Sequence, residues 1–132
     1  MNKVIKDIAL GLLQKSKNGQ VNWVHFNSTN LVGPEGPSQI DDDYAVNTPN
    51  FSINIFAIHE SGIRINIHNE MGDLVSFDVV GYNDPDYALM DSLLQSAKEY
   101  LMDENELLKT IKSDLAKPGT IGLSGNKSDN GF

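Results

Sequence analysis

Residues 51–80, FSINIFAIHESGIRINIHNEMGDLVSFDVV, decide the fold of this chain. Apolar and polar side chains alternate here in three runs, which is the period-two pattern of half-buried β-strands. The runs are residues 51–58, 63–67 and 75–79. Each break between runs contains or ends in a glycine, Gly62 or Gly72, that suits the positive φ of a three-residue hairpin loop. The stretch therefore predicts an antiparallel meander.

Matching the apolar faces of these runs sets an expected register, because a slip of one residue would turn every side chain to the other face. The match places Ile65 between Ile55 on one neighbouring strand and Phe77 on the other. We expect the flanking helices to cover this isoleucine-rich face.

The opposite face of the meander is mostly polar in this register, so we expect it to meet water. The register places Arg64 between Phe56 and Asp78. Phe56 is the exception on a polar face, and Ile58 and Val80 extend it into a modest apolar patch. Such a patch is an interface for a partner or for a second copy, or it is covered by the long loop of residues 27–43.

The segment before the meander predicts a helix and a short strand. Residues 3–16 have helical spacing, and their apolar stripe comprises Val4, Ile5, Ile8, Leu12 and Leu13. Asn18 and Gly19 supply a left-handed stop. Residues 20–26 then alternate as a strand, and we expect Trp23 to anchor the core between helix and sheet.

After the meander the chain returns to helical spacing. Asp84 is a suitable N-cap and Pro85 a suitable first helical residue. The buried stripe that follows contains Tyr87, Met90, Leu94, Ala97 and Leu101. Asp103 reads as a second N-cap, so we expect a break there and a second helix that ends near Ala116.

Residues 27–43 predict a long loop, because they contain two Gly-Pro pairs and end in three aspartates. Loops of this length inside a compact domain are usually functional or disordered. Residues 118–132 are rich in Gly, Ser, Asn and Asp and predict a disordered tail. We therefore expect one α+β domain over residues 1–117: an N-terminal helix, a sheet of three to five strands, and a C-terminal helix or helix pair on one sheet face.

The charge is unevenly distributed along the sequence. Residues 18–97 contain eleven carboxylates and one basic side chain, Arg64, a net charge of −10, whereas the two ends carry nine lysines and seven acids, or +2. Such a field repels phosphate backbones and attracts basic partners. We expect no direct binding of nucleic acid and a basic protein as the partner, although acidic surfaces also serve solubility alone.

The sequence lacks the motifs of several common catalytic and binding sites. The chain has no cysteine, no glycine-rich phosphate loop and no Gly-x-Ser-x-Gly turn. Asp41–Asp43 is the best candidate for calcium or magnesium, but adjacent carboxylates cannot all point inward and EF-hand spacing is absent. We expect no metal, no cofactor and no catalysis. The enzymatic alternative is an acid–base pair of His68 with Asp78.

The sequence also predicts a cytoplasmic location. The first apolar residues are spaced helically and interrupted by Asp7, unlike those of a signal peptide. No apolar run approaches the roughly 20 residues that span a bilayer, so we expect no membrane partner.

Residues 18–23, NGQVNW, and residues 65–75, INIHNEMGDLV, lie between a first and a last helix. This arrangement resembles small uncharacterised α+β proteins of bacteria and their phages, over residues 3–116. The shared motifs are turn and core positions, and residues 27–43 elaborate the pattern. The resemblance implies the fold and a bacterial or phage context, and it carries no functional residue.

These observations predict a non-enzymatic acidic protein-binding module, an inhibitor or decoy of a basic or nucleic-acid-binding partner. The candidate contact residues are Asp41, Asp42, Asp43, Phe56, Arg64 and Asp78. The alternative is a small-molecule or nucleotide-signal binding protein that acts as an oligomer, with residues 27–43 closing over a pocket. A homodimer is compatible with either function.

Overall fold

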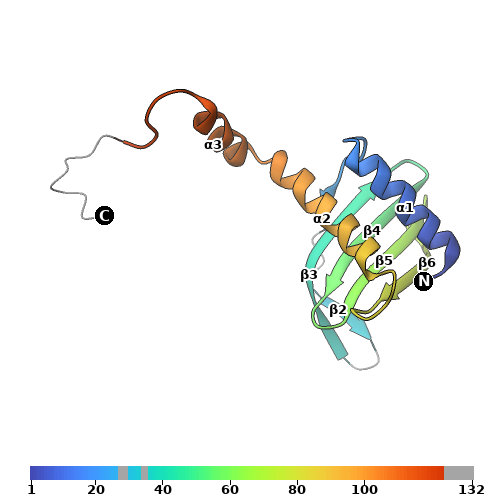
Figure 1. Ribbon diagram of the computed structural model, residues 1–132. Coiled ribbons are helices and arrows are strands. Elements are labelled where there is room, and N and C mark those ends of the chain that lie inside the picture. The colour runs from blue at the N-terminus through green and yellow to red at the C-terminus, as the bar shows by residue number, and fades with distance from the viewer. Residues whose placement is uncertain (27–29, 34–35, 124–132) are drawn as a thin grey trace. The chain divides into compact units, whose positions relative to one another are not determined.

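The computed structural model describes the backbone of residues 1–26, 30–33 and 36–123, and the side chains of residues 1–26 and 43–123. The chain forms two compact units, Met1–Leu101 and Met102–Phe132. Its elements are α1 (Lys3–Lys17), β1 (Val24–His25), β2 (Asn30–Gly33), β3 (Gly36–Asn47), β4 (Phe51–Ile58), β5 (Gly62–Asn69), β6 (Leu74–Val80), α2 (Tyr87–Asp103) and α3 (Glu106–Ala116) (Figure 1).

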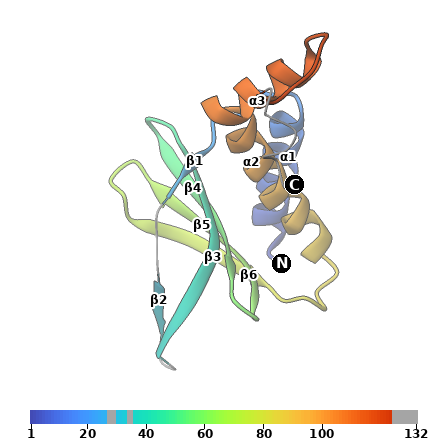
Figure 2. The same cartoon turned by 90° about the vertical axis from the view of Figure 1, so that its left-hand side faces the viewer.

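The first unit has two layers, a sheet and a pair of helices. The strands pair antiparallel in the order β1-β3-β4-β5-β6, and β2 pairs with the other end of β3. Both α1 and α2 lie on one face of this sheet (Figure 2). The expected α+β fold, with helices on the isoleucine face of an antiparallel sheet, is confirmed.

The core lies between the sheet and the two helices. It contains Ile53, Ile55, Ile63 and Ile65 from the sheet, Ile5 and Ala9 from α1, and Met90, Leu93, Leu94 and Ala97 from α2. Trp23 is 2% exposed, and its Nε1 donates to Ser16 Oγ at 2.9 Å, so its role as core anchor is confirmed. Val4 belongs to the apolar stripe of α1 but is 65% exposed and lies outside the core.

Side-chain oxygens cap the helices close to the expected positions. Asn2 Oδ1 accepts from the Val4 N–H at 2.8 Å at the start of α1. Asp84 Oδ1 accepts from the Asp86 N–H at 2.8 Å, and α2 begins one residue later. The expected break between the last two helices is confirmed, but Asn105, not Asp103, is the N-cap of α3.

The β4–β5 hairpin has the expected register. Ile55 pairs with Ile65 and Phe56 with Arg64, and Ile58 pairs with Gly62 across a three-residue loop. The φ of Gly62 is +129°, in the region that favours glycine.

The β5–β6 hairpin begins as expected and then departs from the expected register. The Asn69 N–H donates to the Asp73 carbonyl at 3.0 Å, which closes the predicted turn over residues 70–72. His68 pairs with Leu74, but Ile67 pairs with Ser76, so Val75 is an extra residue in β6. This β-bulge moves all later side chains of β6 to the opposite face.

The bulge corrects two expectations about the sheet faces. Ile65 pairs with Asp78, not with Phe77, and Arg64 pairs with Val79, not with Asp78. Phe77 and Val79 therefore lie on the face that the sequence predicted to be polar.

The expected loop over residues 27–43 is also corrected, because most of it is a hairpin. Gly33 pairs with Gly36 at the turn between β2 and β3, and β3 continues along β4 through an irregularity between Ile40 and Asp43. Pairing with β4 at Ile40 and Asp43, on either side of this irregularity, outweighs the poor strand propensity of the aspartates. The expected strand over residues 20–26 shortens to β1. Residues 27–29, 34–35 and 124–132, which include most of the expected tail, lie outside the described residues.

The second unit contains α3 and the residues after it. The α3 helix has no buried residue, and Leu107, Ile111 and Leu115 on its apolar stripe are exposed.

The close approach of β5 to the end of β6 makes Gly62 irreplaceable. An added Cβ at Gly62 would collide with the carbonyl oxygen of Val80, whereas one at Gly72 (φ +87°) would meet nothing within 4 Å. We expect Gly62→Ala to lower the free energy of unfolding by about 3 kcal/mol, and Gly72→Ala by only about 1 kcal/mol. Urea unfolding of both variants tests this, and equal losses would contradict the geometry.

The ion pair between α1 and the start of α2 predicts a pH dependence. Lys6 Nζ lies 2.9 Å from Asp86 Oδ1, and this hydrogen bond lowers the pKa of Asp86 below its ordinary value of 3.8. The stabilisation is therefore present above pH 3.8 and is lost as the pH falls through the lower folded-state value. The same contact raises the pKa of Lys6 above 10.5, so its contribution is lost only as the pH rises through that higher value.

We therefore expect Asp86→Asn to reduce thermal stability between about pH 5 and pH 9, and to match the wild type in strong acid. Melting temperatures measured across this range test the expectation. A difference that persists unchanged in strong acid would contradict it.

Candidate functional site

The face of the sheet turned away from α1 and α2 is the candidate site, and we call it the outer face. The register assigns two rows of side chains to it. One row contains Val24, Ala45, Asn54, Asn66 and Phe77, and the other Phe26, Asp43, Phe56, Arg64 and Val79. Within residues 1–101, no described helix covers this face (Figure 2).

On the outer face, the side chains in the middle of the sheet are buried, and those at its two margins are exposed and apolar. Ala45 and Phe56 are 0% and 2% exposed, so the middle of both rows is buried. At the β6 margin, Phe77 is 52% and Val79 is 41% exposed. At the β1 margin, Val24 and Phe26 are exposed to a similar extent. Exposed apolar side chains that share one face mark interaction surfaces more often than scattered ones do.

Two contacts on the outer face, with Phe77 and with Asn66, fix the side chain of Arg64. Its guanidinium carbon lies 4.1 Å from the centre of the Phe77 ring, and its Nε donates to Asn66 Oδ1 at 2.7 Å. Partial burial lowers the pKa of Arg64, but an arginine stays charged at neutral pH. Among the described residues, no carboxylate lies within ion-pair distance of Arg64. The side chain therefore presents an ordered cation with terminal N–H donors for another group.

The predicted contact residues separate into different roles. Arg64 pairs with Phe56, as expected, but Phe56 is 2% exposed and therefore offers no surface contact. Asp43 is partly buried opposite Phe56. The side chains of Asp41 and Asp42 lie outside the described residues, although their backbone belongs to β3.

Asp78 lies on the helix-covered side of the sheet, not beside Arg64. Its Oδ2 accepts from the Asn2 N–H at 2.6 Å, and its Oδ1 accepts from the Val79 N–H at 2.9 Å. The carboxylate thus fastens the start of α1 to the edge strand. The hypothetical acid–base pair of His68 with Asp78 is wrong for the same reason, because the two side chains lie on opposite faces.

Sequence reasoning missed Phe77 and Val79 as surface residues and assigned them to the core. The available signal was weak, because Val79 and Val80 are both apolar and satisfy either register.

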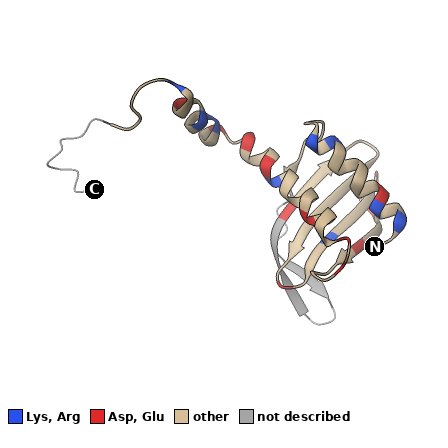
Figure 3. Cartoon of the chain, viewed as in Figure 1, with Lys and Arg blue, Asp and Glu red and all other residues tan. Residues whose placement is uncertain are grey.

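The sheet and α1 differ in charge, whereas α2 contains three acids and one lysine (Figure 3). Helix α1 contains four lysines and one aspartate, a net charge of +3. Residues 43–80, which form most of the sheet, contain five carboxylates and one arginine, a net charge of −4. A basic molecule is therefore attracted to the sheet and not to α1.

The described residues form no metal site of the usual composition. Among them, no group of three or more histidine, cysteine, aspartate or glutamate side chains is placed to hold a metal ion. The helices of the described residues include none that is long and apolar enough to cross a membrane. Comparison with protein-family models, with curated proteins and with solved structures gave no match.

The placement of Arg64 and Asp78 on opposite faces can be tested by double-mutant cycles. We expect the effects of Arg64→Ala and Asp78→Ala on the free energy of unfolding to add within about 0.5 kcal/mol. Arg64→Ala and Phe77→Ala are expected to couple by about 0.5–1 kcal/mol through the cation–π contact. Urea unfolding measures both cycles. Strong coupling between Arg64 and Asp78 would restore the register that the sequence predicted.

Proposed function

We propose that this protein is a non-enzymatic protein-binding module that contacts its partner through the outer face. The observation that carries the proposal is the pair of half-exposed apolar side chains, Phe77 and Val79, beside an ordered Arg64 on the outer face. Burying such side chains on binding contributes roughly 25 cal/mol per Å² of apolar area. Arg64, which has no ion pair among the described residues, lies beside Phe77 and supplies orientation and specificity.

The partner we infer is a protein with an apolar contact patch surrounded by basic residues. Glu60, Glu70 and Asp73, three of the five carboxylates within residues 43–80, lie in the turns that join the strands and support the basic surround. Asp41 and Asp42 add two more negative charges to the sheet, because their backbone lies in β3. Complementary charge mainly accelerates association and excludes wrong partners, whereas the apolar contacts hold the complex.

Blocking a basic or nucleic-acid-binding protein is the use that such a surface fits best. Carboxylates in the turns around the outer face can pair with the rim of a basic groove without the phosphate chemistry of a nucleic acid. In this role Arg64 pairs with a carboxylate or a carbonyl of the partner, which fixes the orientation of the complex.

A pull-down with matched variants tests the proposal. The outer-face variant is Phe77→Ser with Val79→Ser. The control is Val4→Ser with Leu10→Ser on α1, where the two replaced side chains are 65% and 47% exposed. Both double variants remove two exposed apolar side chains, and circular dichroism establishes that both are folded.

We expect a basic protein from the native host to be retained by the wild type and the control, and to bind the outer-face variant about thirtyfold more weakly. Raising the salt concentration should slow its association. Quantitative mass spectrometry of the captured proteins provides the measurement. Equal capture by all three baits, or equal loss from both variants, would refute the outer face as the binding surface.

A further inference from the structure

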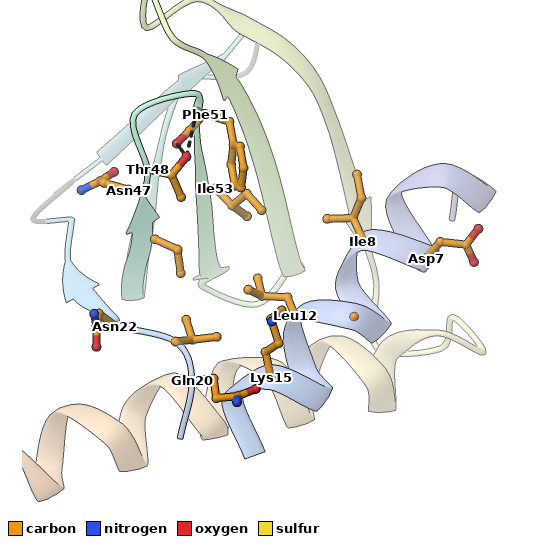
Figure 4. Close-up of a pocket in the computed structure, with 13 residues that line it drawn as sticks. Asp7, Ile8, Leu12, Lys15, Gln20, Asn22, Asn47, Thr48, Phe51 and Ile53 are labelled. Carbon is orange, nitrogen blue, oxygen red and sulfur yellow. Dashed lines mark hydrogen bonds between the residues drawn. The ribbon is translucent and has the colours of Figure 1, made fainter. Parts of the chain in front are cut away.

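A separate cleft lies within the first unit, on the helix-covered side of the sheet and not on the outer face (Figure 2). It has a volume of about 530 Å³ and opens between α1, residues 20–22 and the turn between β3 and β4 (Figure 4). We propose that this cleft binds a small elongated monoacid, with its aliphatic or aryl body on the apolar wall and its carboxylate at Lys15. The site shares no residue with the outer face.

The wall of the cleft is apolar because it is formed by side chains at the edge of the hydrophobic core. Its apolar side chains are Ile8, Leu12, Val21, Val46, Phe51 and Ile53. Val21 and Ile53 are buried, whereas Phe51 is 40% exposed, so apolar surface extends from the core to the mouth. The volume falls within the roughly 300–1,000 Å³ that small-molecule sites occupy.

A glycine in the middle of α1 keeps the cleft open. Gly11 lines the cleft, and a Cβ added there would meet nothing within 4 Å. Packing therefore does not require glycine at this position, although glycine inside a helix is less stable than alanine. A larger side chain at residue 11 would occupy the space that the ligand needs.

The polar groups of the cleft point to an acid. The Asn22 and Thr48 side chains are already bonded, to the Tyr100 hydroxyl and to the Phe51 carbonyl. Lys15 forms no ion pair within the described part of the chain, and Asp7 points away from the cavity in Figure 4. The ammonium group of Lys15 is thus the charged donor available to a ligand.

The surroundings of Lys15 also favour an anion. Helix α1 has a net charge of +3, in contrast to the acidic sheet. At the end of α1, the carbonyls of residues 14–16 already accept from the N–H groups of residues 18–20. Gln20 follows this turn, and its side-chain amide is a second donor at the same end of the cleft (Figure 4).

Thermal shift and calorimetric titration with three eight-carbon probes test the inference. The probes are octanoate, octanol and octylamine, which share one apolar chain and differ in charge. We expect octanoate to raise the melting temperature by about 5–10 °C at a hundredfold excess over its Kd, and the other two probes to have little effect.

Two variants locate the site. Gly11→Leu is expected to abolish the octanoate shift, and Lys15→Gln to weaken octanoate binding about tenfold. Gly11→Ala shows that the helix tolerates a side chain there, because its melting temperature without ligand should equal or exceed that of the wild type. The Phe77→Ser/Val79→Ser variant should keep the full octanoate shift, which separates this site from the outer face.

Three results would overturn the proposal. The first is no response to octanoate in the folded wild type. The second is an octanol or octylamine response equal to that of octanoate, which would exclude a site for acids. The third is an octanoate shift that Gly11→Leu and Lys15→Gln both leave unchanged, which would place binding elsewhere.

Discussion

One extra residue in β6, Val75, determines which side chains the sheet buries and which it exposes. The pairing of β5 with β6 shifts by one residue between His68 and Ile67, and every later side chain of β6 changes face. Without this shift, Phe77 would lie under the helices and Asp78 would face Arg64. With it, the phenyl ring supports Arg64 on the outer face, and the carboxylate of Asp78 reaches the start of α1.

The same bulge separates what the sequence could predict from what it could not. The β4–β5 register was predictable, because isoleucines alternate strictly in both strands and Gly62 marks the turn. The turn between β5 and β6 was predictable for similar reasons. The register beyond that turn was not, because paired valines at the end of β6 fit either face. The bulge is supported by a contact distant in sequence, between Asp78 and the Asn2 N–H, which no local pattern reveals.

The remaining errors also arise from contacts between distant segments. Residues 36–43 were expected in a loop because of their glycine, proline and aspartates, yet β2 pairs with residues 36–39 and β4 with Ile40 and Asp43. The cleft was not predictable, because α1 and the β3–β4 turn meet only in the folded unit. The acidity of the sheet layer was predictable, because charge is a property of composition. Its separation from the basic α1 follows once the helices are known to cover a single face.

Asp78 also bears on how a partner approaches the sheet. An edge strand such as β6 normally offers unpaired N–H and C=O groups to an incoming strand. Here the N–H of Val79 already donates to Asp78 Oδ1, and the second oxygen of that carboxylate is bonded to α1. One donor of the edge is thereby occupied, and the bulge disturbs the regular spacing further along β6. The side chains of Phe77 and Val79 remain exposed on the outer face. A partner is therefore expected to contact the outer face and not to add a strand to the edge of β6.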